Sequence, residues 1–108
     1  MKVVLPLLAG AALVAAGSAH AAMSNADAEA MMKKDGCSAC HAIDKKIVGP
    51  AYKDVAAKYK GDASAPSKLA AKVKAGGSGV WGQVPMPPNP QVKDDELKTI
   101  IAYILSLK

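Results

Sequence analysis

The stretch Cys37-Ser38-Ala39-Cys40-His41 decides how this sequence folds and what it binds. Two thiols three positions apart lie on one turn of backbone, so each can reach a different vinyl group of a single porphyrin and form a thioether bond. His41 then falls beneath the iron. The pattern C-x-x-C-H therefore predicts one covalently attached haem c, with Cys37 and Cys40 as attachment sites and His41 as an axial iron ligand.

Other uses of the same cysteines fit the sequence less well. A thiol-disulfide oxidoreductase also carries C-x-x-C, but between a strand and a helix, and no strand pattern precedes Cys37. A structural zinc site requires four Cys or His ligands, whereas the chain after residue 21 offers three, since His41 is its one histidine. An exported domain with two cysteines ordinarily suggests a disulfide, but this spacing favours haem.

The first 21 residues have the composition of a secretory signal peptide. Lys2 is followed by an apolar run from Val3 to Ala16 and then by Ala19-His20-Ala21, which predicts cleavage at about Ala21/Ala22. A retained membrane anchor needs about 20 apolar residues, and Pro6, among other residues, interrupts this shorter run. We therefore expect a periplasmic protein of residues 22–108, with no transmembrane segment in its mature form.

Composition limits the remaining function classes. The chain of 108 residues has room for one domain, and its formal net charge of +5 comes from lysine alone. A surface that binds nucleic acid usually combines arginine with aromatic side chains that stack on bases. The sequence has no arginine and few aromatic residues, so nucleic acid is not an expected partner. A domain this small also needs a staple for its core, which a buried porphyrin would supply.

Short helices separated by Gly- and Pro-rich segments are the expected secondary structure. Residues 24–34 and 52–59 form the first two helices, and Ser67 caps a third that Gly76-Gly77 ends. The last helix begins at the acidic residues 94–96 and carries one continuous apolar stripe. Residues 76–90 contain too much Gly and Pro for a helix and form a structured loop.

The second axial ligand must approach the iron from the face opposite His41, so it must lie far along the chain. Met86 meets this requirement in Val84-Pro85-Met86-Pro87-Pro88, where prolines hold the backbone extended. The methionines of the first helix are expected to fill the core instead. We predict that the Met86 thioether is the sixth iron ligand.

Three further residues are candidates for the haem environment. The carbonyl of Pro50 is a plausible acceptor for the second ring nitrogen of His41. Trp81 either donates its indole N–H to a haem propionate or packs against the ring edge. Asn89 either donates a hydrogen bond to the methionine sulfur or is an ordinary turn residue before Pro90.

With these residues in place, the chain resembles the small bacterial class I cytochromes c of the c-551/c-552 type, also called cytochrome c8. The similarity covers nearly the whole region after residue 21. Beyond the attachment motif it rests on Val48-Gly49-Pro50-Ala51-Tyr52, Gly79-Val80-Trp81-Gly82 and Pro85-Met86-Pro87-Pro88-Asn89, which occur in the same order and spacing. The resemblance implies an all-α fold of four to five short helices around one covalent haem, with His41 and Met86 as axial ligands.

The same resemblance implies that a haem propionate lies near Trp81. Relatives often place an arginine in the helix before the Gly-rich loop to bind a propionate. This sequence offers only Lys72 and Lys74 there, so the group that binds the propionate stays open.

The resemblance also implies a monomeric electron carrier, not an enzyme, that works in respiration or denitrification. Its partners would be periplasmic redox proteins such as a nitrite reductase, a cytochrome c peroxidase, a terminal oxidase or a membrane quinol-oxidising complex. Lysines around an exposed haem edge would speed the encounter with such partners, and the candidates are Lys33, Lys34, Lys45, Lys46 and Lys53. The alternative function is a haem enzyme or gas sensor with an open sixth iron position.

Overall fold

The computed structural model describes Gly10 and residues 23–108, so the predicted signal peptide 1–21 lies outside the described residues except for Gly10. The described chain forms four α-helices, α1 (Asn25–Lys34), α2 (Tyr52–Lys58), α3 (Ala65–Ala75) and α4 (Asp94–Ser106), and one 3-10 turn, η1 (Cys37–Ala39). Within these residues β-structure is limited to two isolated bridges, His41 with Lys46 and Gly77 with Met86. The all-α prediction is confirmed.

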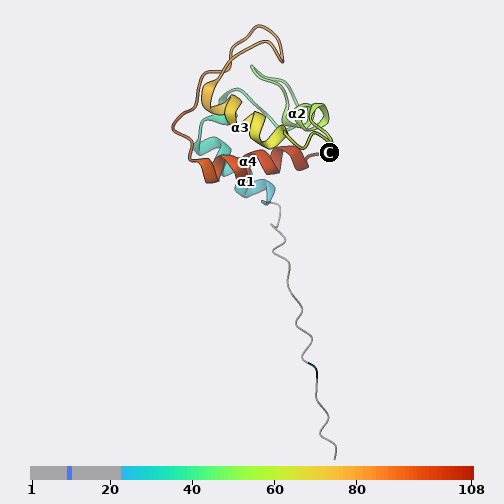
Figure 1. Cartoon of the computed structure of the whole chain (residues 1–108). Helices are drawn as coiled ribbons and strands as arrows, with labels where there is room; N and C mark the ends of the chain where they lie inside the picture. The colour runs from blue at the N-terminus through green and yellow to red at the C-terminus, as the bar shows by residue number, and fades with distance from the viewer. Residues whose placement is uncertain (1–9, 11–22) are drawn as a thin grey trace, which may run out of the picture.

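Helix α4 is the central element, and it contacts α1, α2 and α3 (Figure 1). Its start carries Asp94, Asp95 and Glu96, whose negative charges suit the positive end of the helix dipole. Four residues of the predicted apolar stripe are buried, Leu97, Ile100, Ile101 and Ile104, while the fifth, Leu105, is only partly buried and Tyr103 is buried beside them. Burial of each such side chain contributes roughly 1.5–3 kcal/mol, so α4 holds the other helices together.

Two apolar clusters meet along α4. The first joins Ala28 and Met32 of α1 to Tyr52 and Val55 of α2. The second joins Val92 to Leu97 and Ile101 of α4, with partly buried residues of α3 packed against them. The functional site described below opens between the two clusters, so α4 forms its floor.

The helix boundaries follow local capping chemistry. Ser24 caps α1, because its Oγ accepts a hydrogen bond from the backbone N–H of Asp27 at 3.2 Å. The prediction that Ser67 caps the third helix is wrong, since α3 begins at Ala65 with Pro66 in its first turn. A proline fits there because the first N–H groups of a helix have no partner within the helix.

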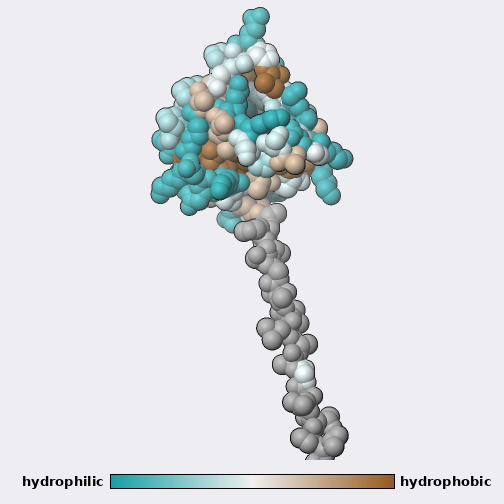
Figure 2. All heavy atoms as spheres, in the orientation of Figure 1, coloured by the Kyte–Doolittle hydropathy of each residue, from teal (hydrophilic) through white to brown (hydrophobic). Residues whose placement is uncertain are grey.

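The segment between α3 and α4 is a loop, as its Gly and Pro content predicts, and Figure 1 shows it arching over the helices in orange. Backbone hydrogen bonds hold it in place, including Asn89 N–H to Val73 O at 2.9 Å. Figure 2 shows a mostly hydrophilic surface on the visible face, with smaller apolar areas between the polar side chains. Within the described residues, no helix has the length and apolar character needed to cross a membrane.

Candidate functional site

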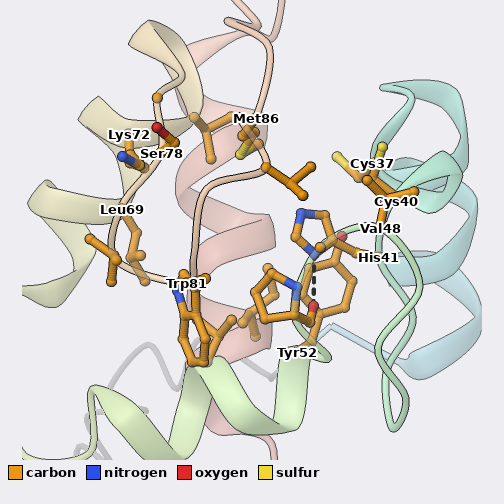
Figure 3. Close-up of a pocket in the computed structure, with 18 of the residues that line it drawn as sticks. Cys37, Cys40, His41, Val48, Tyr52, Leu69, Lys72, Ser78, Trp81 and Met86 are labelled. Carbon is orange, nitrogen blue, oxygen red and sulfur yellow. Dashed lines mark hydrogen bonds between the residues drawn. The ribbon is translucent and has the colours of Figure 1, made fainter.

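The attachment motif sits directly after α1, in a turn that points its reactive side chains one way. Gly36 adopts a left-handed conformation with φ of 81°, which lets the chain reverse after the helix. The backbone N–H groups of Cys40 and His41 both donate to Cys37 O, at 3.2 and 3.1 Å. The two cysteines form no disulfide, and they line one cavity together with His41 (Figure 3). Burial raises the pKa of the Cys37 thiol.

The imidazole of His41 is held by the segment that follows it. Its Nδ1 donates to the carbonyl oxygen of Pro50 at 2.8 Å, the contact for which the sequence made Pro50 a candidate (dashed in Figure 3). Because proline has no N–H, this position can only accept. The ring of Tyr52 stacks on the imidazole, with 5.0 Å between centroids and 21° between planes. Nε2 is thereby left free for a ligand role.

Gly49 lies so close to His41 that only glycine fits. A Cβ built on Gly49 would lie 2.9 Å from Nδ1 and 3.0 Å from Nε2, and nearer still to Cε1. The loop reaches this position because the N–H groups of Val48 and Gly49 donate to Cys40 O, at 3.2 and 2.7 Å. The backbone therefore forms a cradle for the imidazole that a larger residue would fill.

Met86 comes from the loop between α3 and α4 and lines the same cavity as His41. Figure 3 shows the two side chains on different sides of that cavity. The backbone of Met86 forms a reciprocal pair of hydrogen bonds with Gly77, at 2.8 and 3.0 Å. Gly76, with φ of 70°, also packs tightly, since a Cβ there would lie 2.5 Å from Met86 O. Two glycines thus anchor the methionine at the end of α3.

The cavity has a volume of about 260 Å³ and a largely apolar wall. Its floor is the inner face of α4, and other parts of the wall come from α2, α3 and the loop. The apolar residues of α2, α3 and α4 that line it are Tyr52, Val55, Leu69, Val73, Leu97, Ile100, Ile101 and Ile104. A flat apolar porphyrin fits this wall, and two thiols, one imidazole and one thioether supply the attachment and iron-binding groups that haem c requires.

Polar groups of α3 and the following loop also line the cavity. Figure 3 shows Lys72 and Ser78 apart from the two cysteines, with Trp81 near Leu69. Trp81 is 41% exposed, and Lys58 Nζ lies 5.5 Å from its ring centroid. The structure thus keeps both predicted roles for Trp81 available, an indole donor and a packing surface.

The structure separates the two lysines that the sequence left as alternatives for a propionate. Lys74 forms an ion pair with Asp94 at 3.0 Å and donates to the carbonyl oxygens of Pro90 and Val92. Lys72 instead lines the cavity, with its ammonium group beside Gly77. Lys72 is therefore the better placed of the two.

Asn89 makes local contacts. Its Nδ2 donates to Pro87 O at 2.9 Å, and its Oδ1 accepts a hydrogen bond from Gln91 at 3.4 Å. These contacts are those of a turn residue. The other predicted role, a hydrogen bond to the sulfur of Met86, stays a prediction.

The expected docking lysines differ in their surroundings. Lys33, Lys45, Lys46 and Lys53 are exposed, and Lys46 also lines the cavity. Lys34 is exposed as well, but it pairs with Glu96 at 2.5 Å. Five large apolar side chains are also exposed. Ile47 and Val48 directly follow Lys46, and the others, Val80, Trp81 and Val84, belong to the loop between α3 and α4. Among residues 23–108 and at Gly10, no three His, Cys, Asp or Glu side chains are grouped so that they could hold a metal ion, so the structure adds nothing to the zinc alternative.

Sequence reasoning missed two contributors to this site, Tyr52 and Gly49. The sequence assigns neither residue a role, yet the ring of Tyr52 stacks directly on His41 and Gly49 makes room for its imidazole. The one available signal was the compact order Gly49-Pro50-Ala51-Tyr52 shortly after the attachment motif.

Comparison with known proteins finds relatives that match most of this chain. A sequence model of the family described as "Cytochrome c" matches residues 25–108. Cytochrome c-551 of Allochromatium vinosum is 57% identical over 77 residues, which cover 71% of this chain and 82% of that protein. Cytochrome c-552 of Nitrosomonas europaea is 49% identical over 104 residues, which cover 96% of this chain and 95% of that protein.

Solved structures support the same fold. The crystal structure of wild-type cytochrome c552 from Nitrosomonas europaea superimposes with a TM-score of 0.71 at 51% identity. The match covers 74% of this chain and 99% of that one. A class 1 cytochrome, MtoD from Sideroxydans lithotrophicus, gives a TM-score of 0.63 at 30% identity, over 78% of this chain and 97% of that one.

Proposed function

The chain belongs to the cytochrome c family and carries covalently bound haem c, and from that premise we propose that it is a periplasmic electron carrier with His41 and Met86 as its iron ligands. The relatives of the c-551/c-552 type are electron-carrier cytochromes, and the all-α cytochrome c fold is shared with them. The proposal extends that identity to the ligands, the location and the partners.

One observation carries the proposal: His41 and Met86 line one apolar cavity from separate segments of the chain, and hydrogen bonds hold each of them in place. Haem supplies a one-electron iron couple when it is bound. His41 presents Nε2 to the cavity, because its Nδ1 is engaged by Pro50. Met86 is held by Gly77 on a separate segment of the chain. These two residues would hold the iron from fixed positions, so neither would need to leave or join it when the iron changes its oxidation state.

The apolar wall supports the same role. The α4 residues Leu97, Ile100 and Ile101 are each at most 3% exposed, so they exclude water from the cavity floor. A methionine ligand also favours the reduced state relative to a second histidine. We therefore place the carrier on the oxidising side of a respiratory or denitrification chain, between larger redox proteins.

A Met86→Ala variant tests the ligand assignment. Wild-type ferric protein is expected to show the weak long-wavelength absorption of iron bound to methionine sulfur, and the ferrous protein should bind carbon monoxide slowly. Met86→Ala should lose the band and bind carbon monoxide rapidly, while Met31→Leu, which changes a half-buried methionine of α1, should match the wild type. Rapid binding by the wild type would instead support the haem enzyme or gas sensor.

Covalent attachment is tested independently of the ligands. Intact mass and a pyridine haemochrome spectrum should show one haem per chain, joined through Cys37 and Cys40. The same mass should also show a chain that begins at about Ala22, because we propose that residues 1–21 are removed on export. Cleavage there leaves Ser24 in place to cap α1. A colourless chain with two reactive thiols would contradict the proposal.

Docking to partners is proposed to use the exposed lysines near the opening. Lys45 and Lys46 are the strongest candidates because they lie in the loop after the attachment motif, beside exposed Ile47 and Val48. Electrostatic steering of this kind speeds encounter without tight binding and weakens as salt is added. Electron transfer to an acidic redox partner should therefore slow with ionic strength, and Lys45→Gln/Lys46→Gln should flatten that dependence.

A further inference from the structure

Tyr52 stacks on the imidazole of His41 and belongs to the apolar cluster against which Cys37 packs. We propose that Tyr52 is a positioning residue for the iron centre, in which its ring sets the plane of the His41 imidazole. The inference rests on the proposed function, because it takes His41 to be an iron ligand. It assigns a role to a residue that would otherwise count only as core.

The hydrogen bond from His41 to Pro50 does not fix the ring by itself. A single hydrogen bond holds one atom at a set distance, 2.8 Å for Nδ1, but it leaves the ring free to tilt about the line between donor and acceptor. Tyr52 removes that freedom because its ring lies within 21° of parallel to the imidazole, at 5.0 Å between centroids. The backbone of Gly49 limits movement at the Cε1 end of the ring.

Tyr52 can set another ring only because it is itself held firmly. It is 5% exposed and belongs to the apolar cluster of α1, α2 and α4. It is also the first residue of α2, and its backbone N–H donates to Ala42 O at 2.9 Å. The next residue, Lys53, donates in the same way to Ile43 O at 3.0 Å. These bonds tie the start of α2 to the two residues that follow His41.

The test uses the mature holoprotein with two Tyr52 variants and a matched control. Tyr52→Phe keeps the stacked ring and removes the hydroxyl, whereas Tyr52→Leu removes the ring. Tyr103→Phe is the control. It removes the hydroxyl of another buried tyrosine, which donates to Asn25 Oδ1 at 2.6 Å and does not lie at His41 or Cys37. The readout is the spread of the haem methyl proton shifts in the ferric protein, which reports the orientation of the axial ligand planes.

We expect Tyr52→Phe and Tyr103→Phe to keep the wild-type spread of methyl shifts, because neither variant removes the ring at His41. Tyr52→Leu should change the spread. A folded Tyr52→Leu protein with the wild-type spread would overturn the role of the ring. If Tyr52→Leu does not accumulate, Tyr52→Met supplies a flexible side chain of greater length for the same measurement.

The wild-type spectrum separates this inference from the proposed function. If wild-type protein shows methionine-bound iron, the ligand assignment of Met86 stands and the variants test Tyr52 alone. A wild-type ferric protein whose NMR spectrum shows no iron-bound histidine would remove the premise, whatever the variants do.

Discussion

Replacement of Gly49 by alanine should displace the His41 imidazole. The φ angle of Gly49 is not positive, so any residue can adopt its backbone conformation. If only backbone entropy counted, alanine would stabilise the fold by about 0.4–1 kcal/mol. The obstacle is contact, because the added Cβ would lie 2.9 Å from Nδ1 and 3.0 Å from Nε2. Non-bonded carbon contacts are comfortable only from about 3.5 Å. The ring or the loop must therefore move by several tenths of an ångström.

The cost of that movement has two parts. Overpacking of a tight site costs about 1–3 kcal/mol. Displacement of the ring also stretches the bond of 2.8 Å between Nδ1 and Pro50 O, whose loss costs about 1 kcal/mol. After the gain in backbone entropy is subtracted, Gly49→Ala should lower the free energy of unfolding by roughly 1–3 kcal/mol.

Guanidinium unfolding of the ferric holoprotein measures this loss, and the visible spectrum shows whether the iron ligand moved. Gly49→Ala should lower the midpoint and change the spectrum. Gly61→Ala is the control, because Gly61 has φ of 79° and nothing within 4 Å of its added Cβ. It should lower the midpoint through backbone strain, by about 1–2 kcal/mol, and leave the spectrum unchanged. A Gly49→Ala protein with both wild-type stability and the wild-type spectrum would refute the reasoning.

Three further predictions concern the walls of the site and its support. Gly76→Ala places a Cβ 2.5 Å from Met86 O, so it should weaken or abolish the absorption band of methionine-bound iron. Ile101 is 2% exposed, so Ile101→Ala should lower the free energy of unfolding by about 2–4 kcal/mol, measured with denaturant. Burial and the neighbouring Glu96 raise the pKa of Asp35, so its ionised form destabilises the fold, and this penalty grows as pH rises through the folded pKa. Asp35→Asn should therefore stabilise the protein by about 0.5 kcal/mol at pH 7, and urea unfolding should show no gain below the unfolded pKa of about 3.9.

Features with a local signature could be predicted from the sequence. The attachment turn follows from the spacing of Cys37 and Cys40 alone, because it depends on one turn of backbone. Helix α4 follows from its acidic start and apolar stripe, since both lie within 13 consecutive residues. The loop before it follows from Gly and Pro, which exclude a helix wherever they are dense. In each case the deciding interaction joins residues that are close in sequence.

The remaining details depend on segments that meet only in the folded chain. Lys72 and Lys74 look equivalent in sequence, and they differ because Asp94 and the carbonyl groups before it lie beside Lys74. The start of α3 was misplaced because Ser67 resembles a cap, whereas Pro66 suits the first turn and allows an earlier start. Periodicity and capping rules contain no information on these contacts.

The support of His41 shows how a short segment can couple an iron ligand to the whole fold. Three of four consecutive residues contact the imidazole: Gly49 makes room for it, the carbonyl oxygen of Pro50 accepts a hydrogen bond from its Nδ1, and Tyr52 stacks on its face. Each uses a different property, the missing side chain, the carbonyl and the aromatic ring, so none can replace another. Tyr52 also packs with Ile104 in the cluster shared by α1, α2 and α4. A change in the packing of α4 should therefore reach the iron through the orientation of one ring, even where it touches no part of the haem site.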